Sequence, residues 1–284
     1  MKKPTKTNTK KEKTSKLDGI KAMALIKEAL NEPGKRQAAY SAFHNFSLRN
    51  QMLAAWQLEA KGLDIAPIKT FKQWGDYGRT VKKGEKAIAL LMPLIVNIKE
   101  TDEETGEEKV KGQRKIFVEK NYWFALSQTK EFKDDNKKTL KRLENDVPER
   151  SSKQALKNLK LKRIKFTIVN GNAQGYTNSN GIAINPLAVA PVKTMIHEIA
   201  HNLLGHLKNA IKASLDFDLK SIQEAEAETT AYLVCASLGL DGLEYCRNYI
   251  QNWLNGREFS EESAKKCIEA ANKILEAGKT EKAA

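Results

Sequence analysis

The sequence has few of the residues that would anchor a chain in a membrane or join it by disulfides. No apolar run approaches the roughly 20 residues of a membrane-spanning helix, and the lysine-rich start lacks the apolar segment of a signal peptide. The three cysteines, Cys235, Cys246 and Cys267, are an odd number without a CxxC spacing. We therefore expect buried thiols in a soluble, cytoplasmic protein that has no membrane partner.

Histidine is also scarce, and its placement is uneven. Three of the four histidines fall between positions 197 and 206, and two of them belong to the run His197-Glu198-Ile199-Ala200-His201. Two histidines four apart on a helix lie one above the other, so both can bind a single Zn²⁺. Glu198 points in a different direction and could act as general base on a water at the metal. The alternative is a buried apolar helix without metal, but its imidazoles and carboxylate would need other polar partners to offset their desolvation.

A catalytic zinc site needs a third protein ligand. His206 is the tenth residue counted from His197, where the long metzincin pattern needs the eleventh. We therefore interpret His206 as a residue that supports the ligands or ends the helix. On the following predicted helix Glu224 and Glu228 share a face, while Glu226 points away. We predict Glu228 as the ligand and Glu224 as its support or alternative; a solvated acidic helix start is the competing interpretation.

Two strand-type runs precede the metal motif, at residues 166–169 and 182–186, with a Gly/Asn-rich turn region between them. An edge strand there could hold an extended peptide by β-augmentation. The order of strand, edge strand, His-Glu helix and glutamate-bearing helix resembles that of zincin metallopeptidases. The resemblance implies metal binding by His197, His201 and Glu228, with Glu198 as the catalytic base. The residue that would stabilise an oxyanion stays open among Tyr176, His206 and Tyr232.

The net charge of +14 is concentrated in the first part of the chain. Residues 1–165 carry a net charge of +17, whereas residues 166–284 carry −3. The metal motif lies in the nearly neutral part. This asymmetry indicates a polyanion-binding module attached to a separate metal domain.

The basic part has its own pattern of elements. Residues 1–16 hold seven lysines and almost no apolar side chains, and we expect this tail to be disordered. Helices are predicted at residues 17–30 and 36–60, and strands at 87–96 and 115–126 around an acidic tip at 100–108. Between them, residues 70–86 interleave aromatic and basic side chains beside glycines. Such a pattern can stack unpaired bases and contact phosphates, although aromatics at these spacings are as often core residues.

Four blocks in this part occur in the order known from one family. They are Phe43-His44-Asn45-Phe46-Ser47-Leu48-Arg49-Asn50-Gln51, Thr70-Phe71-Lys72-Gln73-Trp74, Gly78-Arg79-Thr80-Val81-Lys82-Lys83-Gly84-Glu85-Lys86 and Tyr122-Trp123-Phe124-Ala125-Leu126-Ser127-Gln128-Thr129. Together with the zinc motif they resemble ArdC-type antirestriction proteins, over roughly residues 20–130 and 160–240. The resemblance implies a single-stranded-DNA-binding domain followed by a zincin domain, and a role in the entry of mobile genetic elements.

Residues that match these blocks are candidates for DNA contact. Their side chains can pair with phosphates, hydrogen-bond to bases or stack on them. From this chemistry we predict contacts by Arg49, Asn50, Trp74, Arg79, Lys82, Lys83 and Lys86. The lysine-rich tail and a long charged segment at residues 131–165 depart from the family pattern.

The expected fold is α+β with two domains. We predict a tail at residues 1–16, an α+β single-stranded-DNA-binding domain with a β-hairpin at 17–132, a charged helical linker at 133–160 and a mostly helical zincin-like domain with a small sheet at 161–284. The expected function is binding of single-stranded DNA without strong sequence preference, combined with a zinc peptidase site that could act on a DNA-bound protein. Alternatives are a DNA-masking binder whose zinc is structural, and a regulatory metalloprotease that cleaves a repressor.

Overall fold

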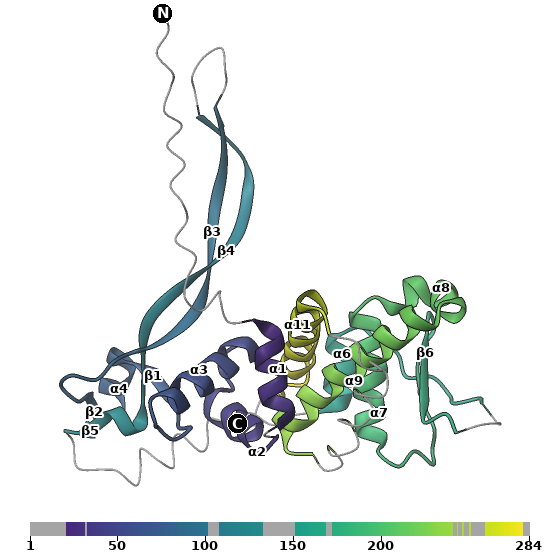
Figure 1. Cartoon of the computed structure of the whole chain (residues 1–284), viewed down its shortest axis with the longest axis horizontal. Helices are drawn as coiled ribbons and strands as arrows, with labels where there is room; N and C mark the ends of the chain where they lie inside the picture. Colours follow the sequence, from purple (N-terminus) through teal and green to yellow (C-terminus); the bar gives the residue numbers. More distant parts are fainter. Residues whose placement is uncertain are drawn as a thin grey trace, which may run out of the picture.

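The protein combines helices and small antiparallel sheets, as the sequence predicts for the fold class (Figure 1). The computed structural model describes residues 21–31, 33–101, 108–132, 151–168, 172–240, 243, 246, 250 and 259–280. The predicted disordered tail and residues 133–150 of the predicted linker lie outside these residues. Within them, no helix is both long and apolar enough to cross a membrane.

Three helices open the described chain: α1 (Ala22–Asn31), α2 (Pro33–Phe43) and α3 (Leu48–Ala60). The prediction of one continuous helix over residues 36–60 is wrong, because the chain turns between α2 and α3. Ser47 is the reason: its side-chain oxygen accepts the backbone N–H of Asn50 and caps the start of α3. A serine at such a position starts a new helix more readily than it continues an old one.

The main sheet has the strand order β1-β4-β3 and is antiparallel. The predicted hairpin is confirmed, and its two long strands are in register along their length except for two shifts. A smaller ribbon pairs β2 with β5 beside a short helix. The elements are β1 (Ile68–Thr70), α4 (Phe71–Asp76), β2 (Arg79–Val81), β3 (Ile88–Thr101), β4 (Glu108–Ala125), η2 (Leu126–Gln128) and β5 (Thr129–Glu131).

The second half is mostly helical, with one small sheet in which β6 pairs antiparallel with β7. The predicted strand at residues 166–169 is not formed in its described part. Instead Arg163, which lies upstream of the predicted strand, forms an isolated parallel bridge with Ile182. Gly181 permits this close approach because it has no Cβ. A Cβ at this position would lie 2.3 Å from the Lys162 carbonyl oxygen. The elements are α6 (Ser152–Asn158), β6 (Gly175–Asn178), β7 (Gly181–Ile184), α7 (Pro191–Leu203), η3 (His206–Asn209), α8 (Ala210–Leu215), α9 (Phe217–Leu238) and α11 (Glu261–Ala277).

One hydrophobic core joins the two halves of the chain. Leu25 of α1 and Leu53 of α3 belong to the same buried cluster as Ile199 of α7, Leu233 of α9 and Ile268 of α11. A second cluster lies between α2, α3 and the main sheet. The domain boundaries near residues 132 and 161 stay a prediction. If the chain is divided there, the two domains share the buried cluster described above.

Polar caps reinforce this interface. The Tyr232 hydroxyl of α9 donates to the Ala29 carbonyl near the end of α1 (2.8 Å). Glu261 accepts the backbone N–H of Ala22 (2.7 Å) at the start of α1, and Asn272 accepts the N–H of Leu48 (2.8 Å) at the start of α3. Each bond satisfies a group that a helix end leaves without a partner, so α9 and α11 complete the N-terminal helices.

We expect the second half to depend on the first for its stability. A fragment of residues 133–284 would expose the apolar side of α9 and leave the caps above unmade, so it should show no cooperative thermal transition by circular dichroism. Co-expression with residues 1–132 should restore the transition of the full chain. A cooperative transition of the isolated fragment at the temperature of the full chain would show that the two halves are independent domains.

Candidate metal centre

Helix α7 carries the two histidines of the motif. Pro191 occupies its first turn, where a missing N–H costs nothing. Met195, Ile196 and Ile199 are buried and fix this helix against the core. His197 and His201, four residues apart, therefore share another face of α7, which is turned towards α9.

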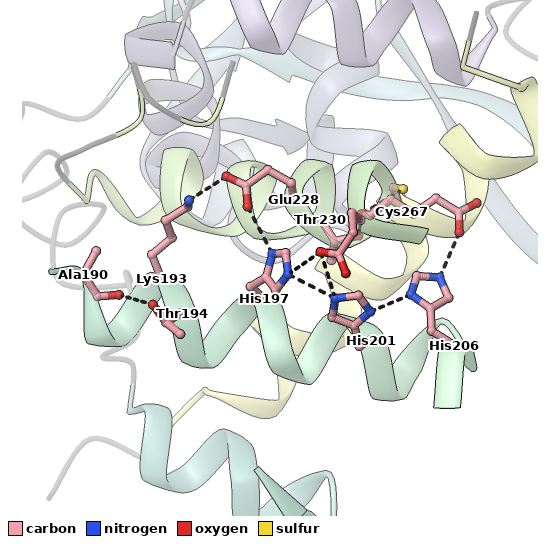
Figure 2. Close-up of polar contacts among 11 residues, drawn as sticks. Ala190, Lys193, Thr194, His197, His201, His206, Glu228, Thr230 and Cys267 are labelled. Carbon is pink, nitrogen blue, oxygen red and sulfur yellow. Dashed lines mark hydrogen bonds and ion pairs between the residues drawn. The ribbon is translucent and has the colours of Figure 1, made fainter. Parts of the chain in front are cut away.

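Helix α9 supplies the carboxylates. Asp216 caps its start by accepting the N–H groups of Asp218 and Leu219, and Gly239 ends it with a φ of 65°. Lys193 of α7 contacts Glu228, whereas His201 contacts Glu224, so the two helices run antiparallel (Figure 2). This register decides which glutamate lies level with the histidine pair.

The structure brings His197, His201 and Glu224 together. Their ligand atoms all lie within 4.8 Å of one another. Among the described residues, these three form the one cluster of side chains that could hold a metal ion. The two Nε2 atoms of the histidines are 3.0 Å apart. Oε2 of Glu224 lies 3.3 Å from Nε2 of His197 and 3.6 Å from Nε2 of His201. Glu224 therefore lies where we expected Glu228, and this geometry favours Glu224 as the third ligand.

These separations suit a small divalent cation. A tetrahedral ion with ligands at about 2.0–2.1 Å requires ligand atoms roughly 3.3–3.4 Å apart. The three measured distances, 3.0, 3.3 and 3.6 Å, lie around that value. Two imidazole nitrogens and one carboxylate oxygen are also a donor set that zinc and related transition metals accept. The residues present therefore fit a metal ion held by three protein ligands.

Glu228 holds His197 from the other side of the ring. Its Oε2 lies 3.1 Å from Nδ1 of His197, and its Oε1 forms an ion pair with Nζ of Lys193 at 2.6 Å. A carboxylate on Nδ1 fixes the tautomer in which Nε2 is free to bind a metal. Sequence reasoning missed Lys193, although it precedes His197 by four residues and so falls on the same face of α7.

His206 supports His201 in a similar way. The Nδ1 atoms of the two rings are 2.9 Å apart, and Nε2 of His206 lies 2.9 Å from Oε2 of Glu226 (Figure 2). If Nε2 of His201 binds the metal, its Nδ1–H donates to His206, which then donates its own Nε2–H to Glu226. Glu226 does point away from the ligand pair, as predicted, but the prediction overlooked that it faces His206.

Charge and burial oppose each other at this site. Burial lowers the pKa of His197, but hydrogen bonds with Glu224 and Glu228 outweigh it and raise the pKa to about 9. Burial favours neutral carboxyls, yet the histidines and Lys193 hold the pKa values of Glu224 and Glu228 below their ordinary value. For Glu198 burial prevails and raises the pKa, against the nearby histidines. A carboxyl with a raised pKa is suited to exchange protons near neutrality.

Two candidates for oxyanion stabilisation are engaged elsewhere. The Tyr232 hydroxyl is buried on the Ala29 carbonyl. The Tyr176 hydroxyl contacts Thr167 (3.1 Å) and the Lys165 carbonyl (3.3 Å).

The cysteines are free and buried, as predicted, and burial raises the pKa of Cys235 to about 12.

Several predicted DNA contacts serve the fold instead. Trp74 has no exposed surface, and its Nε1–H donates to the Phe124 carbonyl (2.8 Å), so its ring cannot stack on a base. Arg79 is buried and pairs with Glu131 at 2.7 Å. Asn50 is buried, and its side-chain amide bonds to the backbone of Leu91. The sequence shows the chemistry of these side chains, but their burial depends on tertiary packing.

The remaining predicted contacts lie nearer to solvent. Arg49 is half-buried on α3, while Lys83 and Lys86 are exposed next to β2. Lys82 is exposed as well, and its Nζ donates to the Ser127 carbonyl at 2.8 Å. The exposed lysines keep the accessibility that a phosphate contact needs, and their DNA contact stays a prediction.

Metal binding should release a proton from His197. Its pKa of about 9 means that this ring is protonated at pH 7 in the metal-free protein, and a metal binds only the neutral ring. The affinity for Zn²⁺ should therefore rise roughly tenfold per pH unit from neutrality towards pH 9. Calorimetric titrations in two buffers with different ionisation enthalpies measure the released proton.

The same pKa has the opposite effect on the metal-free fold. The stabilisation from protonated His197 is complete below about pH 6.5 and is lost as the pH rises through about 9.

The matched control for proton release on metal binding is Glu228→Gln. This variant removes one charge that raises the pKa of His197, so it should release less of a proton on binding metal at pH 7. Metal binding at pH 7 without any proton release would contradict this assignment.

One relative and two solved structures are similar to this chain. An uncharacterized protein of Bacillus anthracis is 28% identical in an alignment of 264 positions, and the match covers 77% of this chain and 42% of that protein. The chain thus spans less than half the length of this relative. Two crystal structures of the antirestriction ArdC protein from plasmid R388, one metal-free and one Mn(II)-bound, are 20% and 17% identical. Each comparison covers 90% of this chain and 97% of the other, with TM-scores of 0.49 and 0.47.

The family match concerns a defined segment. Residues 21–124 match the family model described as the N-terminal domain of anti-restriction factor ArdC. This segment contains α1 to α4 and most of the main sheet. Residues 21–124 of this chain are therefore similar to the N-terminal domain of ArdC.

Proposed function

We propose that this protein binds single-stranded DNA with its N-terminal half and acts in antirestriction, protecting the incoming DNA of mobile genetic elements in the cytoplasm. The observation that carries the proposal is the match of residues 21–124 to the ArdC N-terminal domain. The charge supports it, since residues 1–165 carry a net +17 and a polyanion is the partner that such an excess attracts.

We further propose that the second half holds Zn²⁺ and acts as a metallopeptidase on proteins bound to the same DNA. Zinc would supply Lewis acidity towards a carbonyl and would activate a water for attack. His197, His201 and Glu224 would hold the ion, and Glu228 and His206 would orient the two rings. Glu198 would take the proton of the water and deliver it to the leaving amine, which its raised pKa supports.

A peptide has a place to bind beside this site. The strand β6 pairs on one side with β7 and is an outer strand of its sheet within the described residues. Asn202 of α7 donates to Thr177 of β6, so this strand lies against the motif helix. An extended peptide added to β6 would gain backbone hydrogen bonds there, which supports a protein substrate.

The substitution Glu198→Gln separates the two activities. It removes the proton acceptor but none of the three proposed ligands, so the variant should keep its metal and its affinity for single-stranded DNA. It should lose cleavage of a protein held on that DNA by at least about 100-fold, the usual contribution of a general base. Metal content, gel shifts and a cleavage assay measure the three properties side by side.

Antirestriction in cells decides between the proposal and its main alternative. If Glu198→Gln protects incoming DNA as well as the wild type, the protein acts by covering DNA and the metal is structural. If wild-type protein does not prefer single strands to a duplex of the same sequence, the DNA-binding proposal fails. A repressor-cleaving protease would then be the remaining candidate.

A further inference from the structure

The hairpin β3–β4 extends from the body as a long arm, and its base lies beside β1 and α4 (Figure 1). Three aromatic side chains at this base or further along β4 are more than half exposed: Phe71 (61%), Phe117 (51%) and Tyr122 (54%). Lys72, Lys115 and Lys120 follow or precede them closely in the chain and are half-exposed or exposed. We call these six residues the arm base.

The backbone register brings the start of α4 close to Tyr122. Thr70, the last residue of β1, pairs with Trp123 of β4, so the following residue, Phe71, begins α4 near Tyr122 in the chain path. Tyr122 is the extra residue of a bulge, since Ile88 pairs with Trp123 while Ala89 pairs with Asn121. Bulges redirect a side chain at the margin of a sheet, and here the redirected ring faces solvent.

Each of the two rings on β4 lies under a lysine. Nζ of Lys120 is 5.8 Å from the ring centre of Tyr122, and Nζ of Lys115 is 5.4 Å from that of Phe117. A base can stack on the aromatic ring while the phosphate of the same nucleotide contacts the lysine two residues away. The flexible lysine stem can turn from the ring to a phosphate when a base arrives.

Charge distinguishes between possible partners of this surface. In residues 92–99 and 110–120, which include Lys115, Phe117 and Lys120 of the arm base, five residues are basic and one is acidic. A second copy of the chain would bring like charges together, whereas a polyanion would neutralise them. The sequence of the tip is acidic, with six Asp or Glu between positions 100 and 108, so an anionic partner would be confined to the base.

We propose that single-stranded DNA crosses the arm base, with unpaired bases stacked on Phe71 and Tyr122 and phosphates facing Lys72, Lys115 and Lys120. A duplex hides the faces of its bases, so this surface favours single strands. The inference rests on the proposed DNA-binding function and locates it at residues that differ from Trp74, Arg79 and Asn50, which the fold buries.

Fluorescence anisotropy with oligodeoxythymidylate of about 20 nucleotides, longer than the footprint of one small binding fold, tests the proposal. Tyr122→Ala and Phe71→Ala should each weaken binding about tenfold, the effect of one lost stacking contact. Tyr122→Phe keeps the ring and should bind like the wild type. Lys120→Ala should lower the slope of log affinity against log salt by about 0.7, the value of one phosphate contact to a single strand.

Two controls of the same residue types lie at the other end of the molecule. Phe217→Ala and Lys220→Ala change exposed residues at the start of α9 and should leave binding unchanged. Circular dichroism checks that every variant is folded. If the wild type binds the oligonucleotide and the arm-base variants bind equally well, the inference is overturned while the DNA-binding function stands. If the wild type itself does not bind, the function fails as well. If the control and arm-base variants lose the same amount of affinity, the loss does not depend on the position of the side chain, and the inference is also overturned.

Discussion

The antiparallel packing of α9 against α7 is the constraint on which the rest of the structure depends. Helix α9 has 22 residues, about 33 Å, and its two halves have different neighbours. The first half presents Glu224, Glu226 and Glu228 to the histidines of α7 and η3. The second half is buried under the N-terminal helices, where Tyr232 caps α1 and Ser237 contacts Arg36 of α2. One helix thus links the candidate metal centre to the domain that we propose for DNA.

Each ring of the histidine pair is held on both sides. Glu224 lies at the Nε2 atoms, while Glu228 and His206 lie at the Nδ1 atoms of His197 and His201. In the metal-free protein this arrangement concentrates carboxylates whose charge protonated His197 and Lys193 compensate. Because an unpaired buried charge is costly, a cation at this place would stabilise what the fold has already assembled.

Sequence periodicity identified the motif helix, the glutamate-bearing helix and the hairpin, because these depend on spacing within one element. It could not choose between Glu224 and Glu228, which share a face of α9. That choice depends on how far α9 is shifted along α7, which is a property of packing between elements. The partnership of His206 with Glu226 was missed for the same reason.

Burial was the second property that the sequence did not reveal. Trp74, Arg79 and Asn50 have the chemistry of DNA contacts but hold the sheet and its ribbon together. Exposed rings at the arm base were not singled out, because Phe71 and Tyr122 look in sequence like the core aromatics around them. The single helix predicted over residues 36–60 is interrupted before Ser47, because the side chain of this serine caps the start of a new helix.

The most direct test of the account is a Zn²⁺ titration of wild-type protein beside Glu224→Gln and Glu228→Gln. Glu224 lies at the Nε2 atoms of both histidines and Glu228 at Nδ1 of His197, so on the proposed assignment Glu224→Gln should abolish stoichiometric binding. Glu228→Gln should still bind one ion, with an affinity reduced about 10- to 100-fold, as is usual for residues behind a ligand. Loss of the ion in Glu228→Gln with full retention in Glu224→Gln would contradict the arrangement of this site.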